Sequence, residues 1–220
     1  MINIIFLGAP GSGKGTQATI IAKDLFIPTI STGEILRNEV AKDTEIGKLA
    51  KIYMESGGLV PDKIVVEMIK SRISMPDCNN GFILDGFPRN IVQGQILDDM
   101  LDSIDRKINA VIEIIVADEI IIKRISGRFS CKNCGMVYNH FFNLPKLINT
   151  CDKCGGVNFE NRSDDNLEIV SNRLKTYHNN NRELVEFYRK KHLLSSIDGL
   201  KEIPLVNYEI RKVLNIHNKN

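Results

Sequence analysis

The sequence predicts an α/β fold in which helices cover both faces of a parallel five-stranded sheet. Two observations carry this prediction. Short apolar segments alternate along the chain with longer segments whose apolar residues recur at helical spacing. The first apolar segment ends at a glycine-rich loop that leads into a helix, as in doubly wound sheets. Residues 127–165 interrupt the alternation with cysteines, glycines, asparagines and aromatics, so they are expected to form an insert.

The strand candidates are short apolar runs of the kind found in parallel strands buried on both faces. The first is almost continuously apolar, the third ends in the carboxylate of Asp85, and the fourth contains one charge, Glu113. In chain order the five candidates are residues 2–7, 28–31, 81–86, 110–116 and 193–198.

Helices are predicted between the strands from apolar residues three and four positions apart. Ser31 and Glu34 have capping-box spacing, so a helix is expected to start there and to run through Leu36. Asp62 follows a glycine-rich turn as an N-cap candidate, and residues 217–220 are expected to fray. The other predicted helices cover residues 16–25, 65–73, 92–100, 119–126, 170–187 and 206–214.

The composition restricts the class of protein. A chain of 220 residues suits one domain with inserts, and its 43% apolar and 25% charged residues argue against disorder, collagen-like repeats and coiled coil. Lys and Arg number 29 against 27 Asp and Glu, so the formal net charge is +2. This balance does not support non-specific nucleic-acid binding, which needs a cationic excess, and gives no reason to expect a membrane partner.

The chain is expected to be cytoplasmic. No uncharged apolar stretch reaches the roughly 18 residues of a membrane-spanning helix. The apolar run after Met1 is too short for a secretory signal and lacks a basic region before it. The thiols should therefore be reduced, and clustered cysteines in such a compartment indicate a metal site rather than disulfides.

A phosphate-binding loop follows the first strand. The motif G-x-x-x-x-G-K spans Gly8 to Lys14, between a strand and a helix as the motif requires. Its glycines let main-chain N–H groups point inward onto phosphate oxygens, and Lys14 supplies a positive charge for the terminal phosphates. Gly15 follows the lysine, so the hydroxyl residue Thr16 comes one position later than in the general motif. The loop predicts binding of a nucleoside triphosphate.

Arginines at strand ends and at the edges of the insert indicate the chemistry. Phosphoryl transfer needs positive charge around the moving group, and the planar guanidinium group suits phosphate. Asp85 is placed as a carboxylate near Mg²⁺ or its waters, just before Arg89 at the carboxyl edge of the sheet. Singly, each arginine could be a surface charge; their shared placement favours a role in binding. The candidates are Arg37, Arg89, Arg124, Arg128, Arg162 and Arg173.

Four cysteines in the insert have the spacing of a metal site. Cys131, Cys134, Cys151 and Cys154 follow C-x₂-C-x₁₆-C-x₂-C, which is typical of structural zinc, although four thiolates also suit iron. Four protein ligands leave no open position, so the site should hold the insert together rather than catalyse. His140 is interpreted as a surface or aromatic-packing residue. Cys78 lies outside this pattern and is expected to be a small buried apolar residue.

Together, several segments resemble the adenylate kinase family in kind, order and spacing. They are residues 8–16, 31–37, 58–62, 85–89 with Gln93, and 162–165. The family also shares the Lys14-Gly15-Thr16 pattern. The resemblance implies reversible, Mg²⁺-dependent phosphoryl transfer from ATP to AMP, giving two ADP, in a monomer with a structural Zn²⁺. It implies a core of 1–30, 61–126 and 166–220, an AMP-binding arm of 31–60 and a zinc-binding lid of 127–165.

The resemblance also implies roles for individual residues. It implies that the arm and the lid move, and that Asp164 and Asp165 help to hold the closed lid. The catalytic set would be Lys14, Arg89, Arg124, Arg128, Arg162 and Arg173. ATP would contact Gly11, Ser12, Gly13, Lys14, Gly15, Thr16, Arg128, Val137, Tyr138 and the main-chain carbonyl of Lys201. AMP would contact Thr32, Arg37, Gly58, Leu59, Val60, Gly86, Phe87, Pro88, Arg89, Gln93, Arg162 and Arg173.

Two departures from the family pattern and three alternatives stay open. Phe129 stands where many relatives carry a second arginine, and residues 181–183 replace a stretch that often contains threonine and proline. The alternatives are a kinase for UMP/CMP or GMP, a zinc-ribbon nucleic-acid-binding NTPase, and a switch GTPase. Against the switch GTPase, the sequence contains no Asn-Lys-x-Asp run that would recognise guanine.

Overall fold

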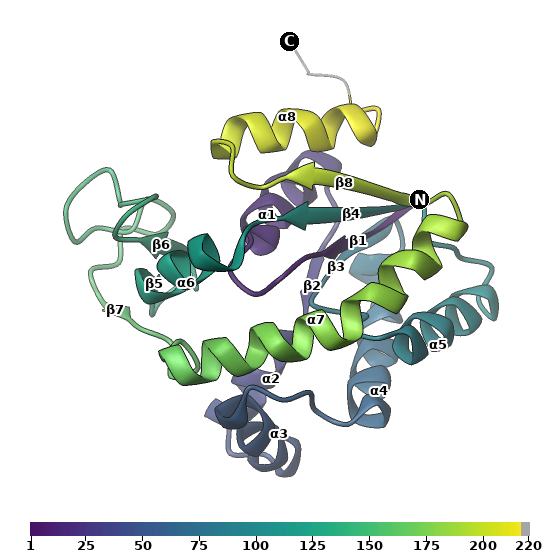
Figure 1. Ribbon diagram of the computed structural model, residues 1–220, viewed down its shortest axis with the longest axis horizontal. Coiled ribbons are helices and arrows are strands. Elements are labelled where there is room, and N and C mark those ends of the chain that lie inside the picture. Colours follow the sequence, from purple (N-terminus) through teal and green to yellow (C-terminus); the bar gives the residue numbers. More distant parts are fainter. Residues whose placement is uncertain (217–220) are drawn as a thin grey trace.

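Five parallel strands form the central sheet of the computed structural model, which describes residues 1–216. Their order is β2-β3-β1-β4-β8, as Figure 1 shows. The strands are β1 (Ile2–Leu7), β2 (Thr29–Ser31), β3 (Gly81–Asp85), β4 (Ala110–Ile115) and β8 (Leu194–Asp198). All five predicted strands are therefore confirmed, and each pairs in parallel with its neighbours.

The register of the strands brings the predicted site residues to one edge of the sheet. Asp85, the last residue of β3, pairs with Phe6 on one side and with Ser31 on the other. The glycine-rich loop after β1, the helix after β2 and the loop after β3 consequently start beside one another. This carboxyl edge is where open α/β sheets bind their ligands.

Both faces of the sheet are buried, which explains why the strands are apolar throughout. Ile4 and Phe6 pack in one core cluster with α1 (Lys14–Leu25), α6 (Asp118–Ser126) and α8 (Ile203–Val213). Ile5 and Leu7 pack in the other, with α4 (Asp62–Ile73) and α5 (Ile91–Asp102). The long helix α7 (Leu167–Lys190) contributes its first half to the first cluster and its second half to the other.

The one charge inside a strand is compensated by hydrogen bonds. Glu113 of β4 is buried and accepts from the hydroxyl of Ser196 at 2.7 Å and from the amide of Asn181 at 3.5 Å. Asn181 also donates to the hydroxyl of Tyr177 at 2.8 Å. Asn181 belongs to the stretch 181–183, which departs from the family pattern. Its amide thus helps to compensate for the burial of the Glu113 carboxylate.

Two helices project below the sheet in Figure 1, α2 (Thr32–Ala41) and α3 (Glu45–Ser56). Helix α2 starts where predicted, but the capping box does not form, because Ser31 makes no side-chain cap bond. Asp62 is also not an N-cap: it is the first residue of α4, and its carboxylate bonds to α5 instead. Helix α3 was not among the predicted helices.

The insert folds as a small antiparallel sheet beside the main one. Its strands are β5 (Arg128–Cys131), β6 (Val137–Asn139) and β7 (Phe159–Glu160), in the order β6-β5-β7. Phe129 stacks on Tyr138 and on His140, whose ring centroid lies 4.4 Å away, and meets Phe159 edge-on. Phe129 therefore belongs to the core of the insert, and the interpretation of His140 as an aromatic-packing residue is confirmed.

Cys78, in the short helix η1 (Pro76–Cys78), is fully buried in the main core, as predicted. Burial raises the pKa of its thiol, although the adjacent guanidinium group of Arg72 opposes that shift.

The predicted fraying of 217–220 concerns residues outside those described. Among the described residues, no helix is both long and apolar enough to cross a membrane.

The packing of α2 against α3 generates a stability prediction at Gly47. A Cβ at this position would lie 2.1 Å from the main-chain oxygen of Glu39, so the helices must separate to admit it. Gly47→Ala should lower the free energy of unfolding by about 1–3 kcal/mol, although alanine is normally the better helix former. Denaturant unfolding measures the change. The exposed Lys48→Ala is the control, and equal stability of Gly47→Ala and the parent chain would contradict the prediction.

Candidate active site

The phosphate-binding loop has the backbone that its glycines allow. Gly8, Gly11 and Gly13 all have positive φ, between 79° and 139°. At Gly8 a Cβ would also lie 2.5 Å from the main-chain oxygen of Ile114, so no larger residue fits. The loop ends at the N-terminus of α1, where no side chain caps the free N–H groups. These groups and the positive end of the helix are available to an anion.

Lys14 bends back over the loop. Its ammonium group donates to the main-chain oxygens of Gly8 at 2.7 Å and of Ala9 at 2.8 Å. Burial lowers the pKa of Lys14 to about 8. The carboxylate of Asp85 opposes this shift, whereas the positive charges of Arg89 and Arg173 add to it. Lys14 therefore lies in a region of excess positive charge.

Most of the residues predicted to contact AMP line one pocket. Its walls combine apolar side chains with three arginines, a lining that suits a ligand with a flat apolar ring and an anionic group. The predicted residues in the lining are Thr32, Arg37, Gly58, Leu59, Val60, Arg89, Gln93 and Arg173. The structure adds Gly33, Leu36, Met54, Gly57, Val65 and Asp164, which were not among the predicted contacts.

Four predicted AMP residues are not part of this lining: Gly86, Phe87, Pro88 and Arg162. The main-chain oxygen of Gly86 accepts from the hydroxyl of Thr32 at 2.8 Å and from the Nε of Arg89 at 2.7 Å, so it holds both side chains at the pocket. Phe87 is buried in the main core, next to Pro88. These contacts give the 86–88 segment a supporting position rather than a lining one.

Several guanidinium groups are held close together at the pocket. Burial lowers the pKa of Arg89 to about 10, and the positive charge of Arg173 adds to the shift. Burial likewise lowers the pKa of Arg162 to about 10, with further contributions from Arg128 and Arg37. Arg89 and Arg162 are therefore still charged at neutral pH, and the repulsion that they experience favours binding of an anion at the pocket.

Two carboxylates of the insert offset part of this charge. Asp164 accepts from Nη1 of Arg173 at 2.8 Å and lies 3.8 Å from Nη1 of Arg37. Burial alone would raise the pKa of Asp164, but these arginines outweigh it and hold the pKa below its usual value. Asp165 accepts from Nε of Arg128 at 2.7 Å. Asp164 thus connects the insert both to α7 and to α2.

Arg124 links the phosphate-binding loop to the segment after β8. Its Nη1 donates to the main-chain oxygen of Ser12 at 3.1 Å, and its Nη2 donates to that of Gly199 at 2.8 Å. Burial lowers the pKa of this guanidinium group. The amino group of Lys201, two residues beyond Gly199, pairs with Glu209. The contact between the main-chain carbonyl of Lys201 and ATP stays a prediction.

Tyr138 does not present its ring to a nucleotide. The side chain is 1% exposed inside the insert, donates its hydroxyl to the sulfur of Cys151 and accepts from the main-chain N–H of Asp152 at 2.7 Å. The ring is part of the core of the insert, so the predicted contact of Tyr138 with ATP, which stays a prediction, would be made by its main chain. Contact between ATP and the half-buried Val137 stays a prediction.

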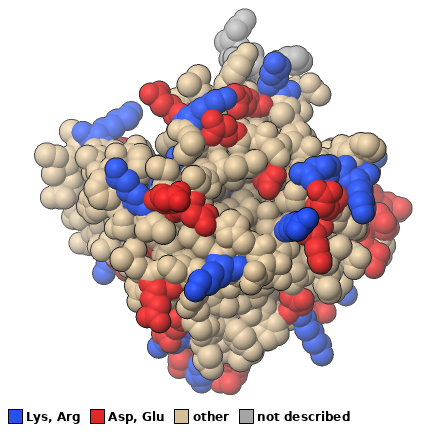
Figure 2. Space-filling view, viewed as in Figure 1, with Lys and Arg blue, Asp and Glu red and all other residues tan. Residues whose placement is uncertain are grey.

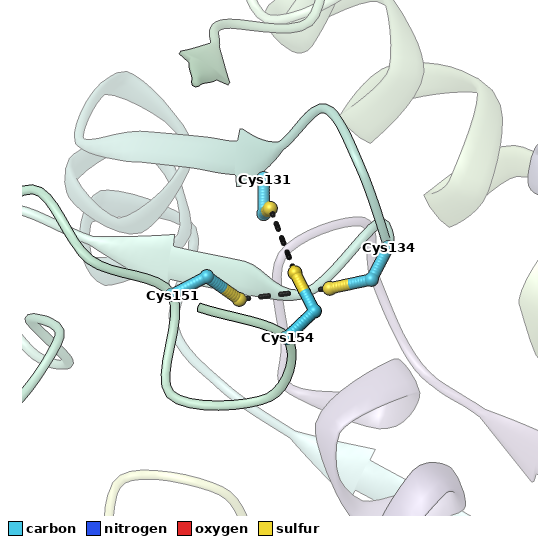
Figure 3. A group of neighbouring side chains, drawn as sticks. All are labelled: Cys131, Cys134, Cys151 and Cys154. Atoms are coloured by element: carbon cyan, nitrogen blue, oxygen red, sulfur yellow. Dashed lines mark hydrogen bonds between the residues drawn. The ribbon is translucent and has the colours of Figure 1, made fainter. Parts of the chain in front are cut away.

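The four cysteines of the insert converge on one point, as Figure 3 shows. Their sulfurs all lie within 4.8 Å of one another, with Cys131 and Cys154 3.6 Å apart and Cys134 and Cys151 3.5 Å apart. Tetrahedral bonds of about 2.3 Å to zinc would separate the sulfurs by about 3.8 Å. The residues present therefore fit a single tetrahedral metal ion.

Two residues that position Gln93 escaped prediction. The carboxylate of Asp62 accepts from Nε2 of Gln93 at 2.7 Å and from the side chain of Asn90 at 3.2 Å. Asn90 also caps α5 by accepting from the main-chain N–H of Gln93. Asp62 and Gln93 are 31 positions apart, so no local pattern connects them.

The lowered pKa of Lys14 generates a prediction about proton uptake. With a pKa of about 8, roughly half of the Lys14 side chains are neutral at pH 8, and bound triphosphate favours the charged form. ATP binding at pH 8 should therefore take up about half a proton, and affinity should fall as the pH rises further. Calorimetry in buffers of different ionisation enthalpy measures the uptake. Lys14→Arg, which stays charged, should lose it; the same uptake in that variant would contradict the assignment.

Comparison with known proteins agrees with this site. The adenylate kinase family profile matches residues 6–193. The adenylate kinase of Archaeoglobus fulgidus is 49% identical over 213 residues, which are 97% of this chain and 98% of that protein. The adenylate kinase of Caldicellulosiruptor bescii is 47% identical over 215 residues, 98% of this chain and all of that protein. The chain belongs to the adenylate kinase family.

Proposed function

We infer that this chain transfers the terminal phosphoryl group of ATP to AMP, reversibly, to give two ADP. It is a phosphotransferase of the adenylate kinase family, and its relatives carry that name over nearly their full length. The observation that carries the proposal is the common position of two sites. The phosphate-binding loop and the arginine-lined pocket share one edge of the sheet. Lys14 of the loop is close enough to Arg89 and Arg173 of the pocket for their positive charges to lower its pKa.

Each substrate has its own set of residues in this proposal. The main-chain N–H groups of 11–16 and the ammonium group of Lys14 hold the phosphates of ATP. Arg37 and Arg89 hold the phosphate of AMP, and Gln93 faces its base. Arg173 lies at the AMP pocket and within electrostatic reach of Lys14, so it stabilises the charge that develops during transfer.

No covalent intermediate or strong base is required. The terminal phosphoryl group passes directly between two oxygen atoms, so the protein contributes alignment and positive charge. Arg124, Arg128 and Arg162 reach the phosphates from the edges of the lid when it closes. Closure excludes water, which would otherwise hydrolyse ATP.

Three parts of the chain are proposed to move relative to one another: a core (1–30, 61–126 and 166–220), an AMP arm (31–60) and a lid (127–165). Some of the contacts between the arm and the core are polar. Thr176 of α7 donates to the main-chain oxygen of Gly57 at 3.3 Å, and Asn172 to that of Ser56 at 3.4 Å. Such bonds exchange readily with water, which supports separate movement of the arm.

Mg²⁺ accompanies ATP in this family, and Asp85 is the residue proposed to hold it through water. A Cβ at Gly15 would lie 3.3 Å from a carboxylate oxygen of Asp85, so this oxygen adjoins the loop that holds the phosphates. Carboxylate oxygens and water are the ligands that Mg²⁺ prefers. The bound ion would neutralise phosphate charge.

The metal proposed for the four cysteines is structural zinc, with iron as the alternative. Apart from the cysteines themselves, the buried core of the lid consists of Phe129 and Tyr138. So small a core supports the view that the metal holds the lid together and lets it move as one body. The four cysteines must be reduced, rather than joined in disulfides, to bind the ion, which supports the proposal of a cytoplasmic location.

We propose a monomer that binds nucleotides and no nucleic acid. The monomer is inferred from the resemblance to the adenylate kinase family. On the face shown in Figure 2, positive and negative side chains are interspersed rather than gathered in a field of one sign. The family match includes the cysteine-bearing segment, which disfavours the alternative of a separate nucleic-acid-binding ribbon.

Two substitutions test the assigned roles. Lys14→Met and Arg89→Ala should each lower kcat for ATP and AMP by about 10³-fold, because each removes positive charge from the transferring group. Coupled-enzyme turnover measures the loss, and circular dichroism checks that both variants fold. The exposed Arg189→Ala should behave like the parent chain. Near-normal turnover in a folded Lys14→Met or Arg89→Ala would contradict the role of that residue.

Removal of the metal tests the role of the cysteine cluster. A chelator should lower the melting temperature and speed hydrogen exchange within 127–165, because the lid core is too small to remain folded alone. Readdition of Zn²⁺ should reverse both effects, and elemental analysis distinguishes zinc from iron. An unchanged melting curve after the ion is lost would show that the metal is not structural.

A further inference from the structure

We propose that Asp62 is a positioning residue that fixes the orientation of the Gln93 amide and so makes the monophosphate site prefer adenine to guanine. The proposal rests on the role of Gln93 at the base of AMP, and it adds a residue that contacts no substrate. Asp62 begins α4, whereas Gln93 lies in the first turn of α5. Gln93 lines the pocket and is 1% exposed.

The two ends of the amide meet partners of opposite kind. Nε2 of Gln93 donates to a carboxylate oxygen of Asp62 at 2.7 Å. Oε1 of Gln93 accepts from the main-chain N–H of Arg89 at 2.8 Å. An ionised carboxylate can only accept and a main-chain N–H can only donate. A flipped amide would therefore face oxygen with oxygen and N–H with N–H, so one orientation is strongly favoured.

Asp62 is itself held in place. Both of its carboxylate oxygens accept from the side chain of Asn90, each at 3.2 Å. Asn90 in turn is fixed as the N-cap of α5. The three side chains thus form a closed network between the start of α4 and the start of α5. All of these bonds are made within the protein, so the orientation of the amide requires no contact with a nucleotide.

The oriented amide has one hydrogen on Nε2 and one lone pair on Oε1 left for a base. Adenine offers an amino donor at position 6 next to a ring-nitrogen acceptor, an edge that a glutamine amide pairs with in two hydrogen bonds. Guanine offers an acceptor at position 6 and a donor at position 1, the reverse order. An amide fixed to match adenine therefore opposes guanine with like groups.

The same reasoning separates the two pyrimidines. Cytosine has an amino donor beside a ring acceptor, as adenine has, and uracil has the order of guanine. The orientation of Gln93 consequently discriminates against GMP and UMP but not against CMP. Discrimination against CMP must come from the size of its ring, through apolar lining residues such as Leu36, Met54 and Val65.

The test is Asp62→Asn, assayed with AMP, GMP, UMP and CMP at saturating ATP and Mg²⁺. Asparagine can donate as well as accept, so the flipped amide loses one of its two unfavourable contacts. The preference for AMP over GMP and over UMP, as a ratio of kcat/KM, should fall about tenfold. The ratio of AMP to CMP should change less than twofold. Asp62→Glu keeps an acceptor-only group and should retain most of the preference.

A control variant and a substitute variant separate this role from other outcomes. Asp99→Asn makes the same change of charge at an exposed position on α5 and should leave every ratio unchanged. A purely structural role of Asp62 would weaken all four monophosphates in parallel, and that result would overturn the proposal. If Asp62→Asn does not fold, Asp62→Ser serves in its place, since a hydroxyl also donates and accepts.

The Gln93→Ala variant distinguishes failure of this inference from failure of the function on which it rests. If Gln93→Ala changes the base preference and Asp62→Asn does not, Asp62 has no positioning role, although Gln93 still reads the base. If Gln93→Ala leaves all four ratios unchanged, the proposed contact between Gln93 and the base of AMP is wrong, and this inference falls with it.

Discussion

The structure depends on the confinement of positive charge at one edge of the sheet. Burial lowers the pKa of Lys14 and of Arg89, and repulsion from the positive charge of Arg173 lowers both further. In the free protein this repulsion is offset by Asp85, by Asp164 and by main-chain oxygens that accept from Lys14. Phosphates bring the charge that the site lacks. The fold therefore stores an unfavourable arrangement that its ligands relieve, and a near-neutral total charge conceals it.

The sheet was predictable because burial on both faces makes every strand apolar, and the phosphate-binding loop because its glycines and lysine are adjacent in sequence. Helix α3 was not predicted, although Ile46, Leu49, Ala50, Tyr53 and Met54 recur at helical spacing, so the signal was present in the sequence. The support of Gln93 by Asp62 joins two helices and leaves no local trace in the sequence. The burial of the Tyr138 ring inside the insert was also not predictable, because its motif identifies the segment but not the direction of its side chain.

The lid shows how an insert can be stable with little apolar material. Phe129 stands where many relatives carry a second arginine, and its ring stacks on Tyr138 and His140. The hydroxyl of Tyr138 reaches the sulfur of Cys151, so the aromatic cluster and the cysteine cluster are joined. The aromatic rings thus compensate for the brevity of the three strands around them.

The length of α7 has a consequence for how the molecule can be observed. Its 24 residues extend about 36 Å, from the lid, where Arg173 meets Asp164, past the arm at Gly57, to the sheet core at Leu184. One continuous helix thus contacts all three proposed parts of the chain (Figure 1). The helix can serve as a common reference for distance measurements. With one spectroscopic label on α7 and the other on one part of the chain, the distance reports the displacement of that part alone.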